Sequence, residues 1–236
     1  MKGMAFEEMY ISLRVKENRV YSDKQLLNLP NVDPGHAYYK EWLIRKRSCR
    51  QLQRYLTSKK RNLKILEIGC GNGWFAAQLL KVRGSKVTGI DINESELAQA
   101  ERVFGGKPGI SFISGDIRSG MLKEANVDII VFAASVQYFP SLKEIVKTSL
   151  DHLAEGGEIH ILDTPFYLPG DLEAARQRTV TYYASMGFPG MADHYFHHGI
   201  DELKPFRYEV LYNASSLLNK LVWRSNPFPW ICVKRQ

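Results

Sequence analysis

A short apolar segment that ends in alternating glycines constrains this chain most, at residues 65–73, where the sequence is ILEIGCGNG. Its apolar part has the pattern of a buried strand, and an amphipathic helical pattern begins directly afterwards at Trp74. Glycine at such a junction permits positive φ and lets a ligand approach the main chain, because no Cβ intervenes. The first amides of the following helix lack intrahelical partners and favour a negative group. The junction therefore predicts a ligand site.

The spacing of the glycines distinguishes two kinds of nucleotide site. A dinucleotide fingerprint, Gly-x-Gly-x-x-Gly, that began at Gly69 would need its third glycine at position 74, which is Trp74. The bulky indole argues against a helix packed tightly over a pyrophosphate. A second strand pattern at 87–90 ends in Asp91, 22 positions after Gly69, at the offset expected for an acid that accepts ribose hydroxyls. The sequence therefore predicts an adenosine site without a diphosphate site.

The run Glu67-x-Gly69-x-Gly71-x-Gly73 resembles the first motif of class I S-adenosylmethionine (AdoMet) dependent methyltransferases. Asp91 and the segment 115–117 (Gly-Asp-Ile) add to the resemblance. Motifs support it over residues 63–163, and the order of the expected strands and helices supports it from there to the C-terminus. It implies an α/β fold with a Rossmann-like seven-stranded, mostly parallel sheet and helices on both faces. The last strand is expected antiparallel, between the fifth and the sixth. A nicotinamide enzyme of the same fold is the enzymatic alternative, and titration with AdoMet and NAD would separate the two.

The resemblance also implies roles for single residues. Glu67 would lie near the methionyl end of AdoMet, Asp91 would hold the ribose hydroxyls, and Asp116 would recognise the amino edge of adenine. Two simpler interpretations stay open, since Asp91 could cap the helix expected near Glu94 and Asp116 could be a turn residue. The whole set expected at the cofactor is Glu67, Gly69, Cys70, Gly71, Asn72, Asp91, Ile92, Asp116, Ile117, Ala133 and Gln137.

The transferred methyl group of AdoMet is electrophilic, so the protein mainly has to position a nucleophile. A base is needed only when the acceptor arrives protonated. His194, His197 and His198 are the candidate catalytic residues, because histidine titrates near neutrality. Their spacing also suits metal ligands on one helical face or an aromatic packing patch, but no complete metal shell accompanies them and no metal is expected. The residues expected near the substrate are Tyr39, Tyr138, Asp163, Tyr182, Tyr183 and Tyr195.

The acceptor class is narrowed by the segment 135–140, SVQYFP, which lacks the paired prolines typical of enzymes that methylate exocyclic base amines. A small-molecule acceptor is therefore favoured. A nucleic-acid methyltransferase is the alternative, because the positive charge is concentrated in one segment. Residues 40–64 carry a net charge of +9 and the remainder of the chain carries −2, which gives the total of +7. A non-catalytic binding or scaffold protein that docks through this basic helix is the third hypothesis. A solvated outer face is the simplest explanation of the charge.

The bulk composition fits one soluble domain of 236 residues, 44% apolar and 24% charged. No apolar run is long enough for a membrane span, and the three cysteines are too scattered for disulfides or a zinc site. A cytoplasmic protein is expected, and the oligomeric state is left open. Residues 1–62 are expected to form an N-terminal flap and a basic helix, which is capped by Asp33 and ends near Leu56. Both pack on a domain that spans 63–236 and contains a lid insertion at about 165–204.

The expected strands lie near 64–68, 86–91, 110–113, 127–133, 157–163, 206–212 and 229–233. The expected helices lie near 74–82, 94–104, 142–153 and 172–186, with a further connection through 217–222.

Overall fold

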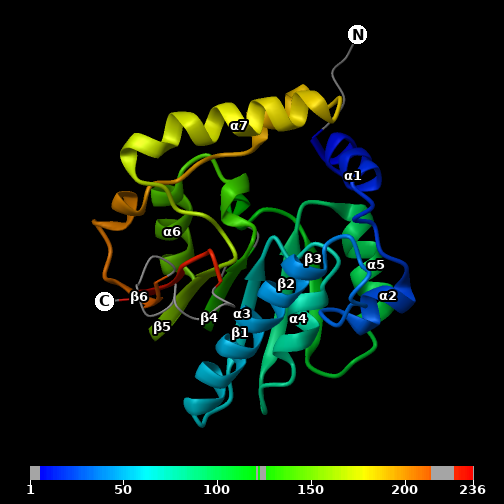
Figure 1. The fold of residues 1–236 in the computed structure, drawn as a ribbon. Coiled ribbons are helices and arrows are strands. Elements are labelled where there is room, and N and C mark those ends of the chain that lie inside the picture. Colours follow the sequence, from blue (N-terminus) through cyan, green and yellow to red (C-terminus); the bar gives the residue numbers. More distant parts are fainter. Residues whose placement is uncertain (1–5, 121, 123–125, 214–225, 236) are drawn as a thin grey trace.

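One mixed sheet of seven strands forms the centre of the protein (Figure 1). The computed structural model describes residues 6–120, 122, 126–213 and 226–235. The strand order is β3-β2-β1-β4-β5-β7-β6, and β7 pairs antiparallel with both β5 and β6. The expected fold class is thereby confirmed, including the antiparallel last strand between the fifth and the sixth. The strands are β1 (Lys64–Ile68), β2 (Lys86–Asp91), β3 (Ile110–Ser114), β4 (Val127–Ala133), β5 (Leu153–Leu162), β6 (Tyr208–Tyr212) and β7 (Trp230–Lys234).

Helices cover both faces of the sheet because successive residues of a central strand point to opposite sides. Ile65 of β1 packs into a buried cluster with α3 and α4, whereas Leu66 and Ile68 pack into a second cluster with α6. All three side chains are at most 2% exposed, as expected for a strand between two parallel neighbours. The α-helices are α1 (Phe6–Lys16), α2 (Asp23–Asn28), α3 (Tyr39–Ser58), α4 (Trp74–Leu79), α5 (Glu94–Phe104), α6 (Leu142–Asp151) and α7 (Leu172–Ser185).

The N-terminal region is more regular than its sequence indicates, since it contains α1 and α2. Ser22 begins α2 with a capping box, in which its side chain and that of Gln25 each accept a main-chain hydrogen bond. The expected cap at Asp33 is wrong. Its main-chain oxygen accepts a hydrogen bond from the amide of His36 in a turn, and α3 starts only after Tyr38.

The insertion between β5 and β6 contains α7 and several short 3₁₀ turns. Figure 1 shows α7 lying across the top of the molecule, above the sheet, with α1 beside one end of α7. The segment η4 (Pro189–His194) contacts both helices, and Leu13, Tyr183 and Met191 form a small buried cluster between them. The expected connection through 217–222 lies outside the described residues. The other 3₁₀ turns are η1 (Ile117–Ser119), η2 (Val136–Tyr138), η3 (Pro169–Asp171) and η5 (Ile200–Leu203).

Among the helices that the structure describes, none combines the length and the apolar character that a bilayer span requires.

Candidate functional site

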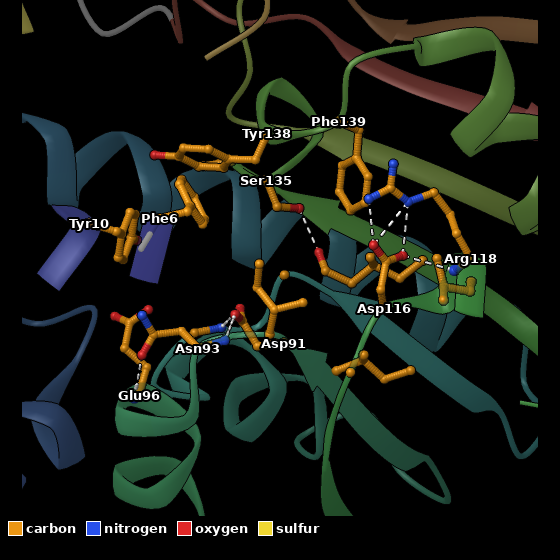
Figure 2. Close-up of a pocket in the computed structure, with 18 residues that line it drawn as sticks. Phe6, Tyr10, Asp91, Asn93, Glu96, Asp116, Arg118, Ser135, Tyr138 and Phe139 are labelled. Atoms are coloured by element: carbon orange, nitrogen blue, oxygen red, sulfur yellow. Dashed lines mark hydrogen bonds and ion pairs between the residues drawn. The ribbon is translucent and has the colours of Figure 1, made fainter. Parts of the chain in front are cut away.

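Two adjoining pockets lie where β1, β2, β3 and β4 end. Pocket A is the cavity bordered by Ile68, Asp91, Asp116 and Phe139 (Figure 2). Pocket B is the neighbouring cavity bordered by Glu67, Asn72, Trp42 and Arg45. In open α/β sheets, ligands bind in the crevice outside the carboxyl ends of the strands, so this is the expected place for a site. The residues that border both pockets are Tyr10, Gly69, Gly71, Glu96 and Ala134.

The loop after β1 separates the two pockets, and its shape requires glycine. Gly69 has φ +72°, and a Cβ placed there would lie 2.5 Å from the Cβ of Ser135. The amides of Gly69 and Cys70 both donate to the carbonyl oxygen of Ile90, at 2.8 and 3.1 Å. The main chain of this loop is therefore fixed against β2, with no side chain between it and the pockets.

Asp91, at the end of β2, accepts a hydrogen bond from the same loop and borders pocket A. Its Oδ2 accepts from the amide of Gly71 at 2.7 Å, and its Oδ1 accepts from the amide of Asn93 at 2.8 Å. Burial raises the pKa of Asp91, and these main-chain hydrogen bonds oppose the shift. Asn93, and not Asp91, caps α5, because its side chain accepts from the amide of Glu96. With main-chain hydrogen bonds from Gly71, Asn93 and Ile92, the carboxylate of Asp91 keeps some acceptor capacity for a ligand hydroxyl.

Glu67 is the buried acid of pocket B, and its side chain is incompletely bonded. The residue is 2% exposed, and among the described residues its Oε2 has no hydrogen-bond partner. Burial, and then the negative charge of Asp91, raise the pKa of Glu67 well above its ordinary value. A buried acceptor without a partner is costly unless a ligand supplies the donor. This arrangement suits a cationic or amino group in pocket B.

The Asp116 region closes the far side of pocket A. Asp116 caps η1 by accepting from the amide of Arg118 and also pairs with its guanidinium group, as Figure 2 shows. Burial tends to raise the pKa of Asp116, but the hydrogen bonds from Arg118 lower it. The Arg118 guanidinium carbon lies 5.4 Å from the ring centre of Phe139. The turn interpretation of Asp116 therefore holds, and the same residue borders the pocket.

The predicted cofactor residues converge on this site with a single exception. Gln137 borders neither pocket, because its amide nitrogen donates to the oxygen of Ala134 and its amide oxygen accepts from Thr164. Those bonds hold η2 against the end of β5 and leave the side chain buried. The predicted cofactor residues that border pocket A or B are Glu67, Gly69, Cys70, Gly71, Asn72, Asp91, Ile92, Asp116, Ile117 and Ala133.

Of the predicted substrate residues, Tyr138 borders pocket A, whereas Tyr39 and Asp163 border neither pocket. Asp163 is buried and accepts a 2.5 Å hydrogen bond from the hydroxyl of Ser48 in α3, and Asn226 donates to the same hydroxyl at 2.8 Å. Its carboxylate therefore anchors α3 to the end of β5.

The three tyrosines of the insertion also lie outside both pockets. Tyr182 donates a hydrogen bond to Glu17, and Tyr183 is buried between α7 and α1. Tyr195 packs edge-on against Tyr138, with ring centres 5.9 Å apart. Tyr195 therefore supports a pocket wall from behind.

The predicted catalytic histidines are separated from the two pockets as well. Nε2 of His197 lies 2.9 Å from the hydroxyl of Thr179 on α7, and Nε2 of His198 lies 3.3 Å from the carbonyl oxygen of Val136. His194 packs on the ring of Phe6, with ring centres 4.8 Å apart. The geometry joins these residues to the insertion and α1, and does not bring them together with Asp91 and the glycine loop.

Three other side chains have the spacing of metal ligands in the described part of the chain: Glu158, His160 and Cys232. Trp230 donates to Nδ1 of His160 at 3.2 Å, so the proton of the neutral ring is on Nε2, which lies 3.3 Å from Glu158. Lys59 pairs with Glu158 at 2.8 Å. The cluster is thus a buried hydrogen-bond network that ties α3 to β5.

Helix α1 also contributes to the site, which the sequence patterns did not predict. Phe6 and Tyr10 of α1 border pocket A beside Tyr138 (Figure 2), and Arg14 borders pocket B. A signal exists in the sequence, because positions 6, 10 and 14 are four residues apart and lie on one helical face.

Comparisons with known proteins agree with this geometry. A family of methyltransferase domains matches residues 65–157. The chain is 28% identical over 162 residues to a sterol 24-C-methyltransferase of Gibberella zeae, which covers 65% of this chain and 41% of that protein. It is 27% identical over 136 residues to a malonyl-[acyl-carrier protein] O-methyltransferase of Halalkalibacterium halodurans, with 54% and 50% covered. The chain thus spans about half the length, or less, of these curated relatives.

A solved structure shows the same fold over nearly the whole chain. The plantazolicin methyltransferase BpumL, in complex with S-adenosylhomocysteine (AdoHcy), superposes with a TM-score of 0.58 at 16% identity. The superposition covers 97% of this chain and 99% of that one. The glycine loop, the acid that ends β2, the strand order and the matched domain together identify residues 65–157 as a methyltransferase domain, in a chain with the fold of class I S-adenosylmethionine-dependent methyltransferases.

Proposed function

We propose that the protein transfers a methyl group from AdoMet to a small-molecule acceptor by in-line displacement. The observation that carries the proposal is the pair of unlike pockets on either side of one glycine loop. Pocket A is mainly apolar and presents Asp91, which suits adenosine, and pocket B is polar and presents Glu67, which suits the methionine portion. A ligand that crosses Gly69 would occupy both pockets at once.

The side chains present fit this ligand in charge and in shape. Oε2 of Glu67 is buried without a partner in the described structure and would accept a hydrogen bond from the ammonium group. Arg45 borders the same pocket and lies near the carboxylate end of such a ligand. The missing side chain at Gly69 leaves the space in which a linear ligand passes the loop.

In pocket A, the carboxylate of Asp91 would accept from the ribose hydroxyls. Ile92 and Ile117 border the same pocket and would pack on the two faces of the adenine ring. Asp116, although paired with Arg118, keeps acceptor capacity for the amino group of the base.

Bound AdoMet supplies a methyl group that is already electrophilic on its sulfonium. The protein would contribute the orientation of the acceptor and the exclusion of water. Tyr10 and Tyr138 border the cavity, as does Ser135 next to Gly69, and these side chains would restrict the approach of the acceptor. Because α1 covers the pockets closely, a small acceptor fits better than a folded macromolecule. One curated relative named above is a sterol 24-C-methyltransferase, and its sterol acceptor supports the same choice.

Calorimetric titration of the protein with AdoMet, AdoHcy and NAD tests the proposal directly. We expect AdoMet and AdoHcy to bind and NAD to bind far more weakly, since a diphosphate has no glycine-lined helix start here. Binding of NAD in preference to AdoHcy would refute the proposal.

A further inference from the structure

We propose that the group methylated is a carboxylate, bound at the junction of the two pockets by Arg14 together with the hydroxyls of Tyr10 and Tyr138. The proposal rests on the proposed function and specifies its acceptor. Arg14 borders pocket B, Tyr138 borders pocket A and Tyr10 borders both, so the three polar groups meet where the pockets join.

Arg14 is held in this position by contacts with residues of α1, of the turn that follows α1, and of η2. Its Nη1 donates to Glu17 at 2.9 Å, and its Nη2 donates to the hydroxyl oxygen of Tyr138 at 3.1 Å. Its guanidinium carbon lies 4.7 Å from the ring centre of Tyr10. A guanidinium group in a fixed orientation is pre-organised to bind a carboxylate through two parallel hydrogen bonds.

The tyrosine hydroxyls complete a set of donors. Because the oxygen of Tyr138 already accepts from Arg14, its own proton is free to be donated to another group. Burial raises the pKa of Tyr10, so its hydroxyl is protonated at neutral pH. Arg14 remains charged, since its pKa is also raised, by the tyrosines and Glu17 against the opposing effect of burial. Glu96 borders the same junction, but burial, and then the charge of Asp91, raise its pKa to about 7, so it opposes an anion less than a fully ionised acid would. One cation and two hydroxyl donors therefore match an anion.

The same positive charge disfavours other acceptors. An amine that arrived as a cation would be repelled by Arg14, and an alcohol or an ammonium group would have to lose a proton. His197 and His198 hydrogen-bond within the insertion and lie outside both pockets. A carboxylate is already ionised at neutral pH and requires no base.

The reaction balances without proton transfer. A lone pair of a carboxylate oxygen forms the new bond to the methyl carbon, the bond between that carbon and sulfur breaks, and its electron pair stays on sulfur. The products are a methyl ester and a neutral thioether.

A binding experiment tests the proposal independently of turnover. The protein saturated with AdoHcy is titrated calorimetrically with benzoate, hexanoate and decanoate, and with benzyl alcohol, hexanol, decanol and hexylamine as uncharged and cationic counterparts. We expect at least one acid to bind about tenfold or more tightly than its matched alcohol, in line with the strength of charged hydrogen bonds. The preference should disappear in Arg14→Gln and weaken in Tyr138→Phe.

A matched control is Arg50→Gln, which removes an exposed arginine of α3 that borders neither pocket and should keep the preference. AdoHcy affinity is measured for every variant. If Arg14→Gln also loses AdoHcy affinity, Tyr138→Phe and Arg14→Lys decide, since both preserve a charged residue at position 14. Transfer from methyl-labelled AdoMet to the acid that binds should give a product that releases label in alkali, as esters do.

Equal binding of acids and alcohols, binding of none of the three acids, or an acid preference that survives Arg14→Gln would overturn the carboxylate proposal. AdoHcy binding would then remain intact, and the proposed function would stand. Failure of the wild-type protein to bind AdoHcy would refute the proposed function itself.

Discussion

Gly69→Ala should destabilise the protein through two separable effects. The first is conformational, because φ at this position is +72° and an L-residue in that region costs about 1–2 kcal/mol. The second is steric, because the new Cβ would lie 2.5 Å from the Cβ of Ser135 and overpacking of this kind costs about 1–3 kcal/mol. The sum is a loss of about 2–5 kcal/mol in the free energy of unfolding.

Two other glycines separate these effects. Gly120 has the same φ of +72°, but an added Cβ there would meet nothing within 4 Å, so Gly120→Ala measures the conformational cost alone. An added Cβ at Gly106 would also meet nothing, and its φ lies outside the left-handed region, so Gly106→Ala gives the baseline. Urea unfolding followed by tryptophan fluorescence yields the three free energies.

The steric effect should be relieved by a change in the partner. Ser135→Gly removes the atom that the new Cβ meets, although it also removes the 2.6 Å hydrogen bond from the Ser135 hydroxyl to the oxygen of Ile68. We expect Ser135→Gly to cost less in the Gly69→Ala background than in the wild type. A steric effect is excluded if Gly69→Ala lowers the free energy of unfolding no more than Gly120→Ala does. It is also excluded if the effects of Gly69→Ala and Ser135→Gly are additive.

Three further predictions concern the site and the core. Asp91→Ala should weaken AdoHcy binding by about 1–3 kcal/mol, because polar partners lose their acceptor, and calorimetry should show no such effect for the exposed Asp151→Ala. Burial alone would raise the pKa of Glu158, but hydrogen bonds from His160 and Lys59 lower it to about 2. A lowered pKa contributes stability that is present above the ordinary pKa of glutamate and is lost as the pH falls toward 2. Glu158→Gln should therefore destabilise the protein at pH 7 and flatten the decline in stability below pH 5. If urea unfolding gives the same dependence of stability on acid pH for the variant and the wild type, this prediction is wrong. His197→Ala should lower the melting temperature through loss of its contact with Thr179 and leave AdoHcy affinity unchanged, and a weaker affinity would return this histidine to the site.

The strands that carry the glycine loop and its acids follow closely from the sequence. Lys64–Ile68 and Lys86–Asp91 have the expected bounds, because each is a short apolar run that ends at a glycine or an acid. Strand ends of a parallel sheet gather at one edge, so local patterns were enough to bring Glu67 and Asp91 together.

The contacts of the insertion and of α1 depend on tertiary packing and could not be obtained in this way. Asp163 has the same position at a strand end as Asp91, but Ser48 from a distant helix occupies its carboxylate. The histidines have a suggestive spacing, yet η4 ends at His194, the chain continues in an extended conformation at Tyr195, and His197 contacts α7. A helix that borders a pocket can lie far in sequence from the other residues of that pocket. The position of α1 could therefore not be predicted from local patterns.

The short length of α1 links the binding of ligands to a remote part of the core. A helix of 11 residues is barely stable alone in water, so its helical state depends on the buried contacts of Leu13 with Tyr183 and Met191. Tyr10 of α1 borders both pockets, so a molecule that occupies them contacts this helix. The packing of Met191 therefore supports a wall of the site as well as the insertion, and we expect substitutions at Met191 to weaken AdoHcy binding without altering any atom that touches the ligand.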